Sequence, residues 1–235
     1  MHSKPIERGD LRRKPRSLAN NVIDSLKSLA IAVLVALCIR VLMFEPFEIE
    51  GPSMEPGLLY GDRVIVAKFL YGLFLPFREE AELNWNSPNV GDVIILASPA
   101  EDVVIIKRVI GSAGDRIEVR DEKMYRNGKA LPLRQVGPCQ TGYGQSDAMC
   151  RVFETELDEK KFLVSMAGPM SDMPEVLVPP DHVFVVGDHR DMSNDSRNPD
   201  LGPIPVKRIK GRGLAVYWSR GREGIRWSRL FSKLN

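Results

Sequence analysis

The feature that most constrains this chain is the apolar run Leu26–Phe44, LKSLAIAVLVALCIRVLMF. As a helix this run would extend about 28 Å, close to the roughly 30 Å hydrocarbon core of a bilayer. Lys27 and Arg40 lie near its ends, where long basic side chains can reach the lipid headgroups. The run exits into Glu45-Pro46-Phe47-Glu48, without the small residues of a signal-peptide cleavage site, and a buried soluble helix would not need the basic flank. The pattern predicts one uncleaved transmembrane anchor.

Charge is distributed unevenly along the 235 residues, although the formal net charge is only +2. Segment 1–28 carries a net charge of +4 and segment 207–235 a net charge of +8, which leaves −10 for the middle. This division is typical of a chain held at a membrane surface, and it argues against a nucleic-acid partner. The positive-inside rule then predicts a basic cytoplasmic N-terminus (1–25), the anchor (26–44) and an extracytoplasmic domain (45–235).

Beyond Phe44, short apolar runs alternate with turn residues about every ten positions. No stretch in this part carries a long helical period, and Asn127-Gly128 is a strong hairpin signal between 124 and 133. The polar segment 139–159 is predicted to leave the main sheet. We therefore expect a mostly β fold with an antiparallel, barrel-like domain outside the membrane. Strands are predicted at 63–69, 92–96, 103–110, 116–120, 161–166, 182–186 and 213–218.

Two cysteines, Cys139 and Cys150, lie in a segment rich in Gly, Gln and Ser that is typical of a loop or hairpin tip. In an oxidising compartment such a pair is expected to form a disulfide. Closing a loop of about 12 residues stabilises a fold by roughly 3 kcal/mol in the chain-entropy model. The chain has no C-x-x-C and only three histidines, which argues against a zinc site.

Three segments carry side chains with possible chemistry. The first is the turn Gly51–Pro56, with Ser53 between two prolines, although most lone turn serines are structural. The second is the strand Val103–Gly111, apolar on both faces with one base on each, and such bases also protect edge strands from aggregation. The third is Gly187–Arg197, GDHRDMSNDSR, which alone could be a solvated, salt-bridged loop.

In this order and behind one anchor, the three segments resemble the motifs of the type I signal peptidases (leader peptidases). Ser53-Met54-Glu55-Pro56 matches the family pattern S-M-x-P, and Lys107–Gly111 followed by Gly114-Asp115 matches K-R-V-x-G with a later G-D. Gly187–Arg197 matches G-D-N-R-D-N-S-x-D-S-R except at His189 and Met192. The resemblance runs from the anchor through Gly211-Arg212. It implies a mostly β fold in the bacterial cytoplasmic membrane, with the catalytic domain outside, and removal of signal peptides from exported preproteins.

The resemblance implies that Ser53 is the nucleophile and Lys107 the general base of an acyl-enzyme mechanism that needs no metal or cofactor. It also implies that Ser193 hydrogen-bonds and orients the lysine, supported by an ion pair between Asp195 and Arg197. A serine hydroxyl is a weak nucleophile until a base takes its proton. A lysine must be neutral to act as that base, which from a reference pKa of ~10.4 costs about 4.6 kcal/mol at pH 7. Burial in an apolar strand lowers this cost.

Three positions depart from the family pattern. Gly51 stands where many members have a serine whose hydroxyl helps to bind the oxyanion, so the Ser53 backbone N–H needs a second donor. His189 and Met192 replace asparagines, which bears on the geometry of the third segment.

On the substrate side, family members bind an extended preprotein with small side chains at the first and third positions before the cut. The apolar residues flanking Ser53 are candidates for the pocket walls, with plain core packing as the alternative; they are Phe47, Ile49, Met54 and Leu58. The C-terminal aromatics Trp227 and Phe231, interleaved with arginines, indicate either a lipid-facing segment or a basic solvated tail. Membrane lipid is therefore an expected partner beside the preproteins.

Two other functions fit parts of the same pattern. A Ser–His–Asp hydrolase could be built from Ser53, His189 and Asp188, because His189 lies in the third segment. A noncatalytic, membrane-anchored homologue could instead bind exported segments, although the intact pair of Ser53 and Lys107 argues against it.

Overall fold

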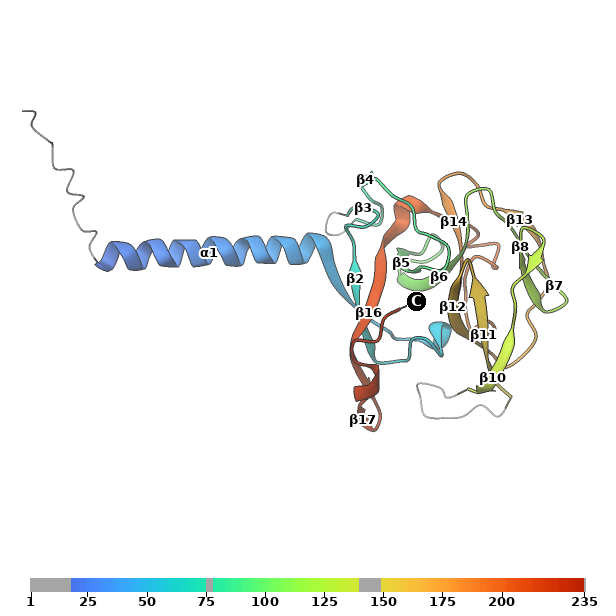
Figure 1. The fold of residues 1–235 in the computed structure, drawn as a ribbon. Coiled ribbons are helices and arrows are strands. Elements are labelled where there is room, and N and C mark those ends of the chain that lie inside the picture. The colour runs from blue at the N-terminus through green and yellow to red at the C-terminus, as the bar shows by residue number, and fades with distance from the viewer. Residues whose placement is uncertain (1–17, 75–77, 140–148, 235) are drawn as a thin grey trace, which may run out of the picture. The chain divides into compact units, whose positions relative to one another are not determined.

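The computed structural model describes residues 18–74, 78–139 and 149–234, which form one α-helix, many short strands and three 3₁₀ turns (Figure 1). The chain divides into two compact units, residues 1–39 and 40–235. The helix is α1 (Leu18–Met43), and the 3₁₀ turns are η1 (Pro52–Met54), η2 (Val206–Arg208) and η3 (Trp227–Arg229). The strands are β1 (Phe44–Glu48), β2 (Asp62–Ala67), β3 (Gly72–Leu73), β4 (Leu83–Asn84), β5 (Val93–Ala97), β6 (Val104–Ser112), β7 (Arg116–Arg120), β8 (Lys123–Arg126), β9 (Lys129–Ala130), β10 (Arg134–Pro138), β11 (Arg151–Leu157), β12 (Lys160–Met166), β13 (Met173–Leu177), β14 (His182–Val186), β15 (Ile204–Pro205), β16 (Ile209–Gly221) and β17 (Gly224–Ile225).

Helix α1 begins eight residues before the predicted anchor and ends at Met43. It gives way to β1 just before Pro46, where the proline disfavours helical backbone in the residue that precedes it. Large apolar side chains between Val22 and Leu42 are exposed on consecutive positions of the helix. Among the described residues, no helix combines the length and mean apolarity that crossing a membrane requires. Most of the predicted cytoplasmic segment, residues 1–17, lies outside the described residues.

The main sheet has eight strands, all paired antiparallel, in the order β1-β2-β16-β5-β6-β14-β15 with β17 added to β16. The sheet curls on itself, and an apolar cluster containing Val64, Ile95, Ile106 and Val216 packs between its strands and the turn after β1 (Figure 1). A second, larger cluster joins the sheet to the strands β7, β8, β11 and β12. The prediction of a mostly β, antiparallel fold is confirmed.

All seven predicted strands are confirmed, and eight further strands were missed. The Asn127-Gly128 turn joins β8 to β9, and the predicted strands correspond to β2, β5, β6, β7, β12, β14 and β16. Strand β1 lacks the apolar pattern used to predict strands, because it contains Pro46 and two glutamates. These residues are tolerated because β1 is an edge strand. Strand β11 was hidden in a segment that looks polar, although Val152 and Leu157 are buried there. The other missed strands are β3, β4, β10, β13, β15 and β17.

Three smaller sheets surround the main one: β10-β11-β12, β13-β7-β8-β9 and β3-β4. The polar segment does leave the main sheet, since β11 pairs with β10 and β12. A disulfide joins Cys139 to Cys150 at the end of this sheet, with the two Cα atoms 5.3 Å apart. The loop between them, 140–148, lies outside the described residues.

Candidate active site

Ser53 lies in the short turn η1, directly after the edge strand β1. The turn is closed by the Glu55 N–H, which donates to the carbonyl of Pro52 at 2.9 Å. The Ser53 carbonyl accepts from the backbone N–H of His189 at 3.0 Å, and Met54 is fully buried. These contacts fix the position of Ser53 from both sides. Ser53 itself is only partly buried, so a substrate can still approach its hydroxyl.

Lys107 lies in β6, and only 4% of its surface is exposed. Its Nζ donates to Ser53 Oγ at 2.9 Å and to the carbonyl of Ile106 at 2.9 Å. Burial lowers the pKa of Lys107 to about 8, against the opposing effect of the carboxylates of Asp195 and Asp188. With that pKa about a tenth of the molecules carry a neutral amine at pH 7, which makes the side chain a usable base.

The third segment, Gly187–Arg197, surrounds this pair with buried ion pairs. Asp188 accepts two hydrogen bonds from the Arg108 guanidinium, each 2.8 Å long, and both side chains are almost fully buried. Asp195 accepts from Arg197 Nε at 2.8 Å and from the Gly187 N–H at 2.9 Å. The segment is therefore a packed, charge-paired structure rather than a solvated loop.

Gly187 allows the third segment to pack closely against the turn that carries Ser53. A Cβ atom at this position would overlap the side chain of Ser193 and lie 2.5 Å from the carbonyl oxygen of Ser53. No larger residue fits between the first and third segments without moving one of them, so the glycine is required by close approach rather than by backbone conformation.

The predicted hydrogen bond from Ser193 to Lys107 is wrong for this structure. Ser193 Oγ is buried and has no hydrogen-bond partner among the described residues. The donors of Lys107 are directed instead to Ser53 and to the carbonyl of Ile106. Asp195 and Arg197 do form the expected ion pair, with NH2 and Oδ2 2.8 Å apart.

The apolar residues that flank Ser53 belong to one cluster. Ile49, Met54 and Leu58 are buried in it, and Phe47 packs against it while remaining partly exposed. They lie around the turn that carries Ser53, so their positions agree with either a pocket wall or core packing. Of these four residues Phe47 is the one that is partly exposed, so it is the one that a bound substrate can contact directly.

The structure disfavours a triad of Ser53, His189 and Asp188. Both carboxylate oxygens of Asp188 are occupied by Arg108, and the His189 ring lies beside another carboxylate, with Nε2 3.4 Å from Asp191 Oδ1. His189 contacts Ser53 through its backbone N–H, while the Ser53 hydroxyl accepts from Lys107.

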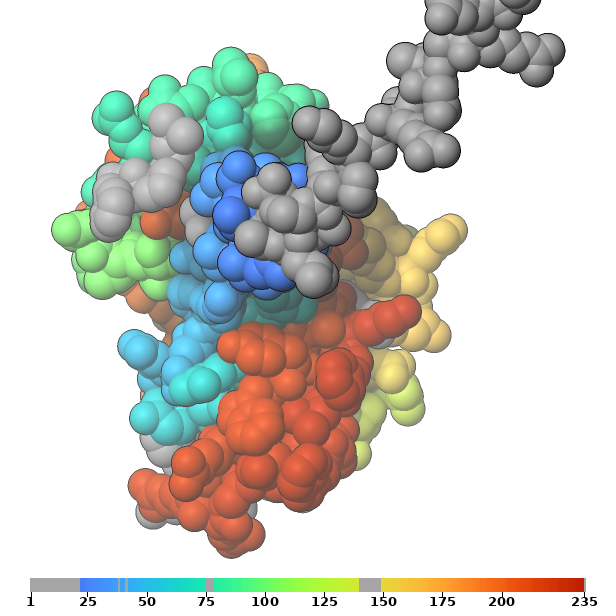
Figure 2. All heavy atoms as spheres, turned by 90° about the vertical axis from the view of Figure 1, so that its left-hand side faces the viewer, coloured from blue at the N-terminus to red at the C-terminus, as the bar shows by residue number. Residues whose placement is uncertain are grey.

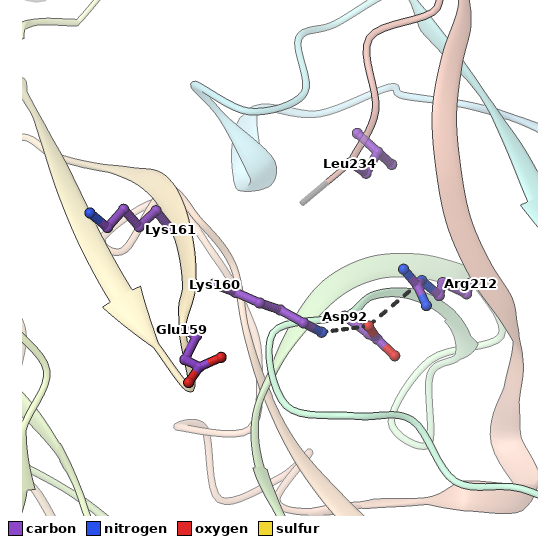
Figure 3. Close-up of a pocket in the computed structure, with 6 residues that line it drawn as sticks. All are labelled: Asp92, Glu159, Lys160, Lys161, Arg212 and Leu234. Carbon is purple, nitrogen blue, oxygen red and sulfur yellow. Dashed lines mark hydrogen bonds and ion pairs between the residues drawn. The ribbon is translucent and has the colours of Figure 1, made fainter.

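Sequence reasoning missed a cavity of about 410 Å³ between β12, β16 and the turn before β5 (Figure 3). Its buried centre is Asp92, which accepts from Lys160 Nζ at 2.9 Å and from Tyr71 Oη at 3.0 Å and lies 3.6 Å from Arg212 Nε. Neither Ser53 nor Lys107 lines it; the lining residues are Asp92, Glu159, Lys160, Lys161, Arg212 and Leu234. In the part of the chain that the structure describes, no group of three or more His, Cys, Asp and Glu side chains could hold a metal ion.

The chain is similar to known proteins over most of its length. A family model described as "Signal peptidase, peptidase S26" matches residues 22–218. The protein "Signal peptidase I" of Pseudomonas fluorescens is 32% identical over 203 residues, which cover 82% of this chain and 71% of the relative. The protein "Signal peptidase I" of Bacillus licheniformis is 32% identical over 207 residues, which cover 87% of this chain and 93% of the relative. All three motif-bearing segments lie inside the family match.

Proposed function

This chain belongs to the signal peptidase family, peptidase S26, and from that premise we propose that Ser53 and Lys107 are the nucleophile and general base of its reaction. As a member of the family it is a serine endopeptidase, a hydrolase that removes signal peptides. The observation that carries the proposed dyad is the 2.9 Å hydrogen bond between Lys107 Nζ and Ser53 Oγ, with the lysine buried.

In the proposed mechanism, neutral Lys107 takes the proton of Ser53 as the hydroxyl oxygen attacks the scissile carbonyl. The tetrahedral intermediate collapses when Lys107 passes that proton to the leaving amine, which leaves an acyl-enzyme on Ser53. Lys107 then takes a proton from water as the water oxygen attacks the ester carbonyl. The second tetrahedral intermediate collapses when Lys107 passes this proton to the Ser53 oxygen, which releases the signal peptide and restores both the serine and the neutral lysine. The Ser53 backbone N–H is one hydrogen-bond donor to the oxyanion. Gly51 has no side chain and cannot provide the second donor.

The substrate in this proposal is an extended preprotein with small side chains at the first and third positions before the cut. Phe47, Ile49, Met54 and Leu58 form the apolar walls that exclude larger ones. Their position around the Ser53 turn supports this assignment, because a closely packed apolar wall beside the nucleophile selects for small side chains. Ser193, whose hydroxyl is buried beside Gly187, is assigned a packing role next to the dyad.

The proposal includes a membrane anchor. Apolar side chains are exposed on all sides of α1, for example at the consecutive positions Val33, Leu34 and Val35, which is typical of a helix that needs an apolar environment. Trp227 and Phe231 are 70% and 78% exposed, as expected for residues that contact lipid headgroups. The N-terminus lies in the cytoplasm and residues 45–235 lie outside.

The orientation can be tested with tags on intact cells. A tag after Asn235 should be digested by protease added outside the cytoplasmic membrane, and a tag before Met1 should be protected, because the basic N-terminal flank resists translocation. Protection or digestion of both tags together would rule out a single anchor.

The activity is tested with the detergent-solubilised full chain and a preprotein. We expect a product of higher mobility on a gel, whose N-terminal sequence begins after an A-x-A-like site. Ser53→Ala should abolish the product with the fold intact by circular dichroism, because the substitution removes the attacking oxygen. A protein that binds the preprotein without cleaving it would instead be the noncatalytic homologue.

A further inference from the structure

We infer that the C-terminal segment 226–234 holds the turn that carries the nucleophile, and that Arg229 is the positioning residue that keeps Ser53 in reach of Lys107. The inference rests on the proposed role of Ser53. It concerns residues that lie more than 160 positions away from the turn in sequence but contact it directly.

The turn η1 lies within a longer loop, residues 49–62, which we call the nucleophile loop. Ile49 N–H donates to the carbonyl of Asp62 at 2.8 Å, and Gly61 N–H donates to the carbonyl of Ile49 at 2.9 Å, so the two ends of segment 49–62 are tied together. Gly61 has a positive φ of 79°, and its carbonyl accepts from the Arg220 N–H at 3.1 Å. Ser53 lies within this loop, so any shift of the loop moves the nucleophile.

Arg229 ties the base of this loop to one of its inner carbonyls. Its Nε lies 3.1 Å from each carboxylate oxygen of Asp62, and its NH2 donates to the same carboxylate and, at 2.8 Å, to the carbonyl of Gly57. Asp62 is fully buried, and it also accepts from Ser219 Oγ at 2.6 Å and from the Leu59 N–H at 2.8 Å. A planar guanidinium with several fixed donors is suited to hold two groups at once, which an ammonium group cannot do in the same geometry.

Arg226 adds a second contact on the same side, since its NH1 donates to the carbonyl of Tyr60 at 2.9 Å. Beyond η3 the chain pairs with β16: Phe231 N–H donates to the carbonyl of Val216 at 2.7 Å, and Leu234 N–H donates to the carbonyl of Leu214 at 3.0 Å. Figure 2 shows the orange to red C-terminal part of the chain at the surface, with cyan residues from the first third of the chain next to it. The segment is thus attached to the sheet at one end and to the loop at the other.

Leu234 adds an apolar contact between the C-terminal segment and the loop. It packs against the cluster that contains Ile49, Met54 and Leu58, and it lines the cavity of Figure 3. On the opposite side the loop is held by β12, because Ser165 Oγ donates to the carbonyl of Glu55 at 2.9 Å. Removing the C-terminal contacts would leave the loop held from one side only.

The test compares Arg229→Met with Arg222→Met, an exposed arginine of the same C-terminal region. We expect Arg229→Met to lower kcat for preprotein cleavage by roughly 100-fold, because a displacement of about 1 Å at a reacting group can have that effect, with KM changed by less than about threefold. Arg222→Met should leave both constants within about twofold of the unmodified chain. Arg229→Lys should fall between them, and it serves as the measurement if Arg229→Met does not fold.

A second variant separates positioning from stability. Arg226 NH1 stays 3.8 Å from Asp62 Oδ1 in Arg229→Met, but the closer cation of this buried carboxylate is gone. Asp62→Asn introduced into Arg229→Met removes the buried negative charge, so it should raise the thermal midpoint toward that of the unmodified chain without recovering kcat. Recovery of kcat together with the midpoint would show a merely structural role and overturn the inference, as would equal kcat in Arg229→Met and Arg222→Met. If Ser53→Ala remains active, it is the proposed function that fails.

Discussion

Replacing Lys107 with alanine should lower kcat/KM for preprotein cleavage by roughly 10²–10⁴-fold, the usual contribution of a positioned general base. Lys107→Arg should lose about as much despite its positive charge, because a guanidinium keeps its proton at these pH values and cannot act as a base. The measurement is kcat/KM on one preprotein, with circular dichroism to verify the fold. The structural basis is the buried Nζ, 2.9 Å from Ser53 Oγ.

The matched control is His189→Asn, which introduces the residue of the family pattern and should keep most of the activity. The backbone N–H of His189 donates to the Ser53 carbonyl, and the substitution leaves this hydrogen bond in place. If Lys107→Ala kept the activity and His189→Asn lost it, a histidine-dependent hydrolase would replace the proposed dyad.

Asp188→Ala should lower the free energy of unfolding by about 3–5 kcal/mol, the usual effect of breaking a buried ion pair by removing one partner. Asp188 makes two 2.8 Å hydrogen bonds with Arg108, and the substitution takes this carboxylate away from a guanidinium that stays buried. The Phe162 ring, 4.1 Å from the Arg108 Cζ, does not replace the lost carboxylate. The measurement is urea unfolding of the solubilised chain followed by tryptophan fluorescence.

Glu48→Ala provides the comparison, because Glu48 also pairs with an arginine. The pair of Glu48 and Arg63 is about half exposed, with NH2 and Oε2 3.1 Å apart, and its loss should lower the free energy of unfolding by less than about 1 kcal/mol. Equal losses in the two variants would contradict the view that burial makes the Asp188 pair matter.

Much of the sheet could be predicted from the sequence because its strands carry local signals. The stretch around Lys107 is apolar on both faces, and it is an interior strand of the main sheet. The edge strand β1 could not be recognised, because Glu45 and Pro46 are acceptable only where one side of the strand is unpaired, and pairing is not a local property.

The site could be predicted only where its residues stand in dense motifs. Ser53 and Lys107 belong to such motifs, and the structure brings them together. Arg229 and Asp62, or Lys160 and Asp92, meet across long stretches of chain, and nothing near either member signals its partner. The C-terminal arginines therefore suggested a lipid-facing or solvated segment, although Arg226 and Arg229 turn inward to the nucleophile loop.

The three-stranded sheet β10-β11-β12 is not a module that can be trimmed to make a smaller catalytic unit. Through β12 it provides the ring that stacks on Arg108, the Ser165 hydroxyl on the Glu55 carbonyl, and the Lys160 ammonium on Asp92. Excising it would remove one contact each from Arg108, from the turn that carries Ser53 and from Asp92, even though none of its residues takes part in the proposed chemistry. Any shortened version of this domain must therefore keep β12 or replace all three of its contacts.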